Sequence, residues 1–293
     1  MFAAPFVVEV PVFPLPFAPA CRTAAVPVLA LACLLAGLLG LGVAPPAAPA
    51  AAPVTTVPAT GLADVYAQHR QAARTGPGRR FLTYDRAGRG LVTEVLGDLR
   101  SAPTVAVLVG GVGTDLATYE RGTLRAGARA LAAPGRAVVA WADYVSPASL
   151  GPDAAGPDLA RTGGDRLRTF LDSLHAHTAA TRVVLVCHSY GSAVCAAALA
   201  DGRAHGVGDV VDLASPGVGD GDLPEGVRRW TATAPDDPIR FVPHVRLGGL
   251  GLGEDPAATP GARRLPVPAD GGHDGYLVAG SPTLAAVQAL LSA

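Results

Sequence analysis

The chain has 293 residues, of which 49% are hydrophobic and 16% are charged, and its formal net charge is −1. A chain of this length can bury one sizeable core, and α/β architectures often run as a single domain at this size. The near-neutral charge, without a run of like charges, excludes the basic face typical of nucleic-acid-binding proteins, so we expect no nucleic-acid partner.

The N-terminal part of the chain divides by composition into three segments. Residues 1–23 are an apolar, proline-rich extension, residues 24–43 are an uncharged apolar run, and residues 44–60 are rich in proline and alanine. The apolar run fits either a signal peptide cleaved near 48–51 or a single membrane anchor, since about 20 apolar residues span a bilayer. The proline-rich segment has the composition of a semi-rigid linker. We therefore expect a protein of the cell membrane or a secreted protein, with its folded domain at 61–293.

The first half of this domain shows strands that alternate with helices. A helical spacing of apolar residues covers 61–74, and two short strands joined by a glycine-containing turn cover 81–85 and 91–96. The continuous apolar run 104–109 is typical of a strand that is buried on both faces of a parallel sheet. The next predicted elements are a crossover helix at 119–133, a strand at 137–141 and a helix at 164–177.

A glycine-rich loop, residues 110–113, follows the buried strand 104–109. Its glycines let the backbone approach a substrate closely. In α/β hydrolases a backbone N–H of this loop helps to hold an oxyanion, and we predict Val112 as this donor, with Gly113 as the alternative. Dinucleotide binding is not favoured, because the loop does not continue to the pattern G-x-G-x-x-G.

The sequence around Ser189 has the pattern of a nucleophile elbow. The apolar strand 182–187 leads directly into His-Ser-Tyr-Gly, and a helix of small residues is predicted at 192–200. Such a tight turn lifts the serine Oγ clear of the sheet, and the N–H of the next residue, Tyr190, can donate to an oxyanion. Cys187 stands where the usual G-x-S-x-G pattern has its first glycine. A serine in an ordinary turn is the alternative, but the flanking strand and helix favour the nucleophile.

The cysteines are Cys21, Cys33, Cys187 and Cys195. Two lie in the N-terminal apolar segments and two flank Ser189, whereas a disulfide-dependent secreted domain distributes paired cysteines through its loops. We expect these cysteines to act as small buried hydrophobic residues. Cys187 at a strand end and Cys195 on a helix are expected to point to different places.

Two adjacent carboxylates are candidates for the acid of a catalytic triad. Strands are predicted at 210–214 and 230–234, and Asp236 and Asp237 follow the second of them. An acid just beyond the C-terminal end of a strand lies where α/β sheets build their sites. We predict Asp237 as the acid; Asp236, or a simple turn role for the pair, is the alternative.

His273 is the predicted base. A serine hydroxyl needs a base to accept its proton, and in α/β hydrolases the acid and then the base follow the nucleophile in the chain. His273 lies among glycines just before a predicted C-terminal helix at 283–291. Its main competitor is His244, in the long Gly/Pro-rich stretch 242–268, which we expect to cover the site. No grouping of His and Cys has metal-site spacing, so we expect neither a metal nor a cofactor.

These motifs together resemble the actinobacterial α/β-hydrolase family catalogued as a domain of unknown function, DUF1023. The resemblance runs from about Arg80 to the C-terminus and rests on RFLTYD, VAVLVGGVGTDL, WADYVSP, VCHSYGS, DLASPGVG, DDPI and HDGYL. The family usually has glycine where this chain has Cys187, and proline where it has Gly110. The resemblance implies an α/β-hydrolase fold, with a mainly parallel sheet and helices on both faces. It also implies a triad of Ser189, Asp237 and His273.

From these residues we expect a serine hydrolase that acts on an ester or related acyl substrate, small or lipid-like, through an acyl-enzyme. Two other classes stay open. One is a catalytically inactive binding module of the same fold, suggested by Cys187 in place of glycine. The other is an acyltransferase that uses the same triad with an acceptor other than water. The sequence indicates neither the acyl group nor the oligomeric state.

Overall fold

The computed structural model describes residues 52–247 and 249–293. Its sheet has eight strands in the order β1-β2-β4-β3-β5-β6-β7-β8. The strands are β1 (Arg80–Asp85), β2 (Leu91–Leu96), β3 (Thr104–Val109), β4 (Arg136–Ala142), β5 (Arg182–His188), β6 (Val207–Leu213), β7 (Arg228–Ala232) and β8 (Arg263–Arg264). The pairs β1–β2 and β2–β4 are antiparallel, and the other pairs are parallel. The predicted α/β class with a mainly parallel sheet is therefore confirmed.

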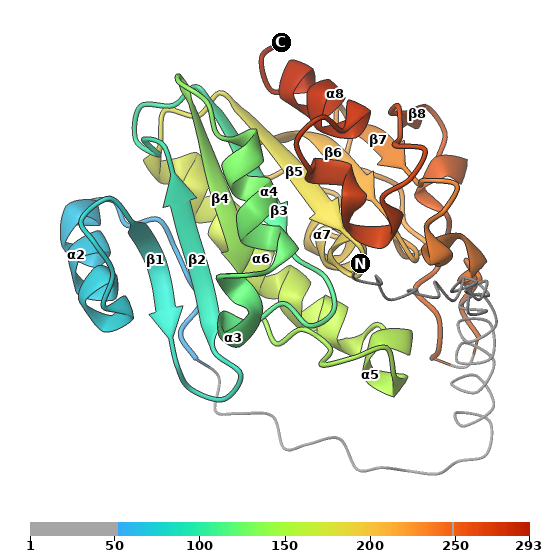
Figure 1. The fold of residues 1–293 in the computed structure, drawn as a ribbon, viewed down its shortest axis with the longest axis horizontal. Coiled ribbons are helices and arrows are strands. Elements are labelled where there is room, and N and C mark those ends of the chain that lie inside the picture. Colours follow the sequence, from blue (N-terminus) through green and yellow to red (C-terminus); the bar gives the residue numbers. More distant parts are fainter. Residues whose placement is uncertain (1–51, 248) are drawn as a thin grey trace, which may run out of the picture.

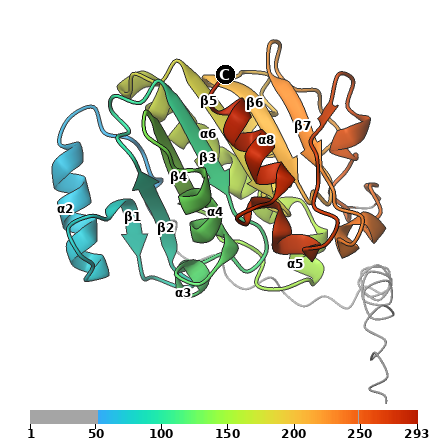
Figure 2. The same ribbon diagram turned by 45° about the horizontal axis from the view of Figure 1, so that its top comes forward.

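Helices cover both faces of this sheet (Figures 1 and 2). On one face, α6 (Asp158–His177) and α7 (Gly191–Leu199) pack on the strands, and on the other face α4 (Thr123–Leu131) and α8 (Pro282–Leu290) do so. The central strands β3 and β5 are buried from both sides, which explains their unbroken apolar runs. The shorter helices are α2 (Leu62–Ala73), α3 (Leu116–Tyr119) and α5 (Pro152–Ala155), and the 3₁₀ helices are η1 (Pro238–Phe241), η2 (Pro256–Ala258) and η3 (Gly272–Leu277).

Two predicted helices differ from the structure. The single crossover helix predicted at 119–133 is divided into α3 and α4, because Gly122 takes an extended conformation between them. The helix predicted at 164–177 begins earlier, at Asp158, where Ala160 is already buried. The helix α8 begins as expected: the Ser281 side chain caps it by accepting from the Thr283 N–H.

Residues 52–58, which we expected to be part of the linker, pack on the folded body, and we call them the N-terminal strap. Val57 is fully buried in the core beside α6. The Thr55 N–H donates to Asp143 Oδ2 over 2.9 Å, and the Val57 N–H donates to Ser173 Oγ over 2.8 Å. The folded body therefore begins before the predicted boundary at 61.

The predicted N-terminal extension, the predicted signal or anchor segment and the first part of the predicted linker lie outside the described residues. Within 52–247 and 249–293, none of the helices combines the length and the apolar character that a bilayer crossing needs.

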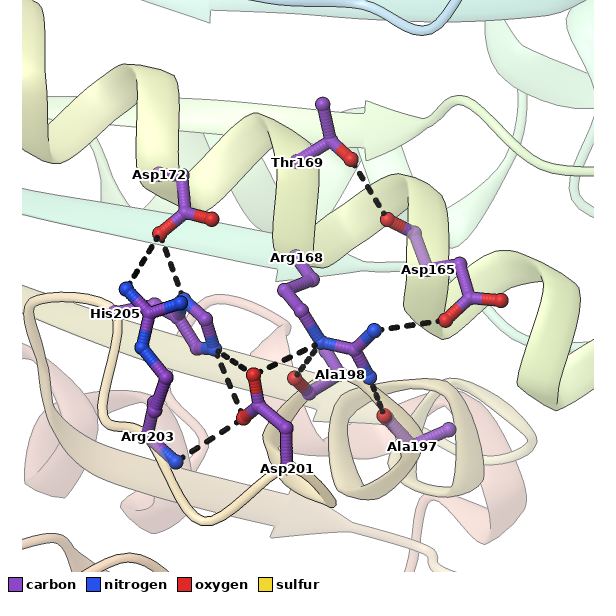
Figure 3. Close-up of polar contacts among 9 residues, drawn as sticks. All are labelled: Asp165, Arg168, Thr169, Asp172, Ala197, Ala198, Asp201, Arg203 and His205. Carbon is purple, nitrogen blue, oxygen red and sulfur yellow. Dashed lines mark hydrogen bonds and ion pairs between the residues drawn. The ribbon is translucent and has the colours of Figure 1, made fainter.

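A polar cluster fixes α7 to α6 (Figure 3). The fully buried His205 side chain has Nδ1 2.7 Å from Asp172 Oδ1 and Nε2 3.0 Å from Asp201 Oδ1. Arg168 of α6 donates to the carbonyls of Ala197 and Ala198, the last turn of α7, over 2.8 and 3.0 Å. These contacts hold in place the helix that begins immediately after Ser189.

Candidate active site

Ser189 lies in a strained turn between β5 and α7. Its φ is 55°, in the left-handed region that non-glycine residues rarely adopt. The turn is closed by the Ser189 N–H, which donates to the Leu213 carbonyl over 2.8 Å. Two glycines leave room for this turn, Gly191 after the serine and Gly111 in the neighbouring loop after β3. A Cβ on Gly191 would lie 2.6 Å from the Val109 carbonyl oxygen, and one on Gly111 would lie 2.8 Å from the Ser189 Cβ. This is the geometry of a nucleophile elbow.

The expectation for Cys187 and Cys195 is wrong, because they form a disulfide with their Cα atoms 6.5 Å apart. Cys187 ends the buried part of β5, and Cys195 lies in the second turn of α7. The elbow at Ser189 folds the helix back against the strand, so side chains eight residues apart face each other. The close approach of strand and helix, which a glycine usually permits at position 187, is here made through a covalent bond. Cys21 and Cys33 lie outside the described residues.

The structure brings together the three residues predicted as a triad. Ser189 Oγ lies 2.9 Å from His273 Nε2. On the other side of the ring, His273 Nδ1 lies 3.0 Å from Asp237 Oδ1 and 3.2 Å from Oδ2. Asp237 is fully buried, whereas a third of the His273 side chain is exposed. A base that contacts a serine on one side and a buried carboxylate on the other can take up the serine proton.

The Asp237 carboxylate is surrounded by hydrogen-bond donors. The Tyr276 hydroxyl donates to Oδ2 over 2.6 Å, and the Ile239 N–H donates to Oδ1 over 2.8 Å. Burial by itself would raise the pKa of Asp237, but the bonds from His273, Tyr276 and Ile239 outweigh burial and leave the pKa below its ordinary value. Asp237 is therefore ionised at neutral pH, as the partner of a proton-accepting histidine should be.

Asp236, the alternative acid, occupies a different place. Its Oδ2 accepts from the N–H groups of Gly271 and Gly272 over 2.9 and 2.8 Å. Both glycines have positive φ, 142° and 58°, so the turn that delivers His273 needs them. The two adjacent aspartates thus have different contacts: Asp237 bonds to the His273 imidazole, and Asp236 bonds to the backbone of the turn before it.

His188 also contacts the backbone of the loop that carries His273. Its Nε2 lies 2.8 Å from the carbonyl oxygen of His273. Burial lowers the pKa of His188, and the neighbouring His273 lowers it further. The ring is therefore neutral at pH 7 and donates its Nε2–H to that carbonyl. His188, which directly precedes Ser189, thus contacts the loop that carries the predicted base.

The predicted oxyanion donors, Val112 and Tyr190, lie on the two backbone segments that meet at Ser189. Within the described residues, neither N–H donates to a backbone carbonyl. The alternative donor Gly113 is engaged, because its N–H donates to the Pro147 carbonyl over 2.8 Å. The geometry therefore leaves the N–H groups of Val112 and Tyr190 available to a ligand.

Two tyrosine hydroxyls that the sequence analysis missed hold this region. The Tyr144 hydroxyl donates to the Gly110 carbonyl over 2.8 Å and fixes the loop of Val112. The Tyr190 hydroxyl donates to the Gly156 carbonyl over 2.9 Å and accepts from the Ala160 N–H over 3.0 Å. Tyr144 lies within the motif WADYVSP, which was the signal available in the sequence.

The competing histidine, His244, has Nε2 3.4 Å from the Ser215 carbonyl oxygen, and it is His273 that contacts Ser189 Oγ. The stretch 242–268 that we expected to cover the site contains the short elements η2 and β8. In the part of the chain that the structure describes, no group of three or more His, Cys, Asp or Glu side chains is arranged to hold a metal ion.

A buried ion pair lies beneath the elbow. Asp212 of β6 is paired in the sheet with Cys187 of β5, and Arg229 Nε lies 3.2 Å from its Oδ2, out of hydrogen-bond geometry. Burial raises the pKa of Asp212 to about 6, although Arg229 and Ser192 act in the opposite direction.

Comparison with known families matches residues 85–247, more than half of the chain, to a family model described as alpha/beta hydrolase, formerly DUF1023. The chain belongs to this alpha/beta hydrolase family. The matched residues include Ser189 and Asp237, and the predicted resemblance is confirmed.

Solved structures of other alpha/beta hydrolases are distant from this member of the family. A dienelactone hydrolase from Anabaena variabilis is 16% identical, with 73% of this chain and 96% of that chain covered and a TM-score of 0.44. Esterase 2 of Thermogutta terrifontis is 11% identical, with 74% of this chain and 92% of that chain covered and a TM-score of 0.43. A lipase-esterase related protein from Clostridium acetobutylicum is 16% identical, and the match spans 43% of this chain and less than half (46%) of that chain, with a TM-score of 0.30. No curated protein matches the chain.

Proposed function

We propose that this family member is a serine hydrolase that cleaves an ester or a related acyl substrate through an acyl-enzyme. The observation that carries the proposal is the unbroken hydrogen-bond path from Ser189 Oγ, through both nitrogens of His273, to the buried Asp237 carboxylate. Nucleophile, base and orienting acid in this order are the arrangement that serine hydrolases on several folds share.

The chemistry assigned to each group follows from its contacts. His273 Nε2 takes the Ser189 proton as Oγ bonds to the substrate carbonyl carbon, and Asp237 stabilises the resulting imidazolium. The N–H groups of Val112 and Tyr190 hold the oxyanion of the tetrahedral intermediate. His273 then gives the proton to the departing alcohol, which leaves an ester on Ser189. Water, deprotonated by His273, attacks that ester, the bond between the acyl carbon and Oγ breaks, and His273 returns the proton to Ser189 as the acid departs.

Cys187 in place of glycine suggested an inactive module, but the local geometry supports an active one. Ser189 keeps the left-handed φ of an elbow, and its Oγ is within hydrogen-bond distance of His273 Nε2. The larger side chain is accommodated because it bonds to Cys195 instead of pressing against α7.

The same disulfide supports a location outside the cytosol. Disulfides persist in oxidising compartments and are rare in reducing ones. Together with the apolar run at 24–43, the Cys187–Cys195 bond supports secretion or attachment to the outer face of a membrane. The partner would be a small or lipid-like acyl substrate.

A fluorophosphonate probe tests the proposal, because it reacts covalently with activated serines. The wild-type chain should be labelled, and Ser189→Ala should lose both labelling and p-nitrophenyl ester hydrolysis, the latter by about a thousandfold or more. Ser149→Ala is the matched control, since Ser149 is an exposed hydroxyl in the loop after β4. Equal labelling of the wild type and Ser189→Ala would refute the proposal.

A further inference from the structure

The large hydrophobic side chains that are exposed gather at one edge of the molecule. Those outside the strap, which we call the apolar rim, are Val145, Leu150, Phe241, Val245, Leu247 and Val278. Leu247, Leu150 and Phe241 are the most exposed, with exposed fractions of 72%, 66% and 62%. All six lie on segments that follow the C-terminal ends of strands or the 3₁₀ helix η3, the edge at which Ser189 lies.

Each rim segment is tied to the candidate active site. Phe241 ends the 3₁₀ helix that begins directly after Asp237, and Val278 follows the 3₁₀ helix that contains His273. Leu150 lies two residues before α5, and the carbonyl of Gly156, directly after α5, accepts a hydrogen bond from the Tyr190 hydroxyl.

The loop that carries Leu247 belongs to the same surface. The N–H of Gly251 donates to the carbonyl of Ala155, in α5, over 2.7 Å. The segments that carry the rim are therefore linked to one another and to the segments that carry Asp237, His273 and Tyr190. Contiguous exposed apolar side chains of this kind mark sites that bind a protein, a ligand or a membrane.

The path of the N-terminal part of the chain favours a membrane among these three kinds of partner. Arg166 donates to the carbonyls of Ala52 and Pro53 over 2.8 and 2.9 Å, and Thr55 bonds to Asp143, which directly follows β4. The strap therefore starts at the edge that carries the rim and, as Figure 1 shows, at the same lower edge as α5. Only eight residues separate it from the uncharged apolar run at 24–43, so a membrane that holds that run lies within about 30 Å of the first residue of the strap.

We propose that the apolar rim is a lipid-binding face that seats the candidate active site on a membrane surface, from which the acyl substrate is drawn. The second half of this statement rests on the proposed hydrolase function, and the first half does not. Among the nearby arginines, Arg246 pairs with Asp220 at 2.7 Å and Arg161 with Asp158 at 2.9 Å. Arg240 has its guanidinium 5.4 Å from the centroid of the Phe241 ring and donates to the Pro235 carbonyl over 2.6 Å. Binding is thus driven by apolar contact, and a zwitterionic lipid suffices.

The binding half is tested by fluorescence quenching with the full chain on phosphatidylcholine vesicles that contain brominated acyl chains. Phe241→Trp places a reporter on the rim. Of the two native tryptophans, Trp141 is fully buried in the core and Trp230 is half-buried on β7, so the fluorescence added by the substitution is compared with that of the wild type. The matched control is Ala132→Trp, at an exposed position that precedes β4 and so lies at the opposite edge of the sheet. We expect bromolipid to quench the added fluorescence of Phe241→Trp at least about twofold more than that of Ala132→Trp. Equal quenching overturns the proposal, as does a concentration-dependent change without lipid, which would indicate a second copy on the rim.

The substrate half is tested by the ratio of two rates, hydrolysis of an ester carried in the vesicles and of a short water-soluble ester. Phe241→Asp combined with Leu247→Asp should lower this ratio about tenfold, because burying two charges in lipid opposes binding. Ala132→Asp should leave it unchanged, and an unchanged ratio in the double variant overturns this half. Absence of hydrolysis of either ester by the wild type refutes the proposed function, while the quenching result still decides the binding half.

Discussion

Tyr276 is the residue that most directly tunes the predicted acid. Its hydroxyl donates to Asp237 Oδ2 and accepts the N–H of Ala234 over 2.8 Å, so it joins the carboxylate to the end of β7. A hydrogen bond to a charged acceptor contributes roughly 1.5–3 kcal/mol, more than a neutral one. The hydroxyl is therefore a positioning group whose removal should be visible in the pH dependence of the reaction.

Tyr276→Phe should lower kcat/KM for a p-nitrophenyl ester about tenfold. Without this donor the pKa of Asp237 rises towards its ordinary value, so the carboxylate is protonated at a higher pH and activity is lost at a higher pH on acidification. The matched control is Tyr66→Phe, because the buried Tyr66 hydroxyl has no hydrogen-bond partner among the described residues. A lower rate with an unshifted acid limb of the pH–rate profile would contradict the assigned role.

Asp212 should make the stability of the protein depend on pH. Its pKa of about 6 in the folded state lies above the value of about 4 in an unfolded chain. The folded state therefore binds the extra proton, and stability from this group is fully present below pH ~4 and is lost as the pH rises through ~6. The loss amounts to at most about 3 kcal/mol.

Urea unfolding at pH 4.5 and pH 7 measures this effect. Asp212→Asn should remove this contribution. The change in the free energy of unfolding between pH 4.5 and pH 7 should therefore differ by about 2 kcal/mol between the variant and the wild type. The free energy of unfolding at one pH is a poor measure, because the variant also leaves Arg229 without its buried partner. Identical pH slopes in the two proteins would show that Asp212 does not titrate in this range.

Among the elements, the pair β5 and α7 depends on the Cys187–Cys195 bond. It closes a short loop, eight residues apart in sequence, directly around the elbow. In the chain-entropy model such a bond stabilises the folded state by about 2 to 3 kcal/mol. Both cysteines are fully buried, so a reductant reaches them only when α7 opens.

Replacing both residues, Cys187→Ala with Cys195→Ala, should lower the free energy of unfolding by about 2 kcal/mol in urea. Dithiothreitol should destabilise the wild type by a similar amount and leave the double variant unaffected, which makes the variant its own control for the reagent. A wild type that responds to dithiothreitol no more than the variant does would mean that the two thiols are not joined.

The central strands were predictable because burial on both faces leaves a continuous apolar run, whereas the predicted strands 210–214 and 230–234 are shifted from β6 and β7, and β8 was not predicted. The continuous runs at β3 and β5 predict both strands to within a residue, since only strands covered on both faces exclude polar side chains over this length. The disulfide was not predictable, because it depends on how sharply Ser189 turns the chain. The break between α3 and α4 was missed because apolar spacing continues through Gly122, where the backbone is extended.

At the scale of the whole molecule, the site is assembled from segments far apart in the sequence: Ser189 and His273 are 84 residues apart and meet at 2.9 Å. The order of the three residues along the chain, together with the family resemblance, pointed to them, with Asp236 left open as the alternative acid. The contacts that hold them were not predictable, because Asp236 and His188 act on backbone groups of the loop that contains His273. Bonds from a side chain to the backbone of a segment far away in the sequence leave no recognisable pattern of residue types.

The N-terminal strap should contribute to the stability of the whole domain. Val57→Ala should lower the free energy of unfolding by about 2 kcal/mol, because Val57 is fully buried against α6. Val54→Ala, which makes the same change three residues away at a side chain that is 37% exposed, should change it by less than about 0.5 kcal/mol. Equal effects in thermal or urea unfolding would mean that the strap does not pack on the body in solution.

The strap starts at the edge that carries Ser189, whereas α8 ends at the opposite edge. There Arg136, the first residue of β4, donates to Ser292 Oγ over 2.6 Å, beside Ala293 (Figure 1). An affinity tag, a bead or a sensor chip joined after Ala293 would therefore leave the serine facing the bulk liquid. An attachment at the N-terminal end of the strap would instead place the solid support against the edge that carries Ser189. An assay that compares the two immobilised forms should thus find the first accessible to large substrates and the second obstructed.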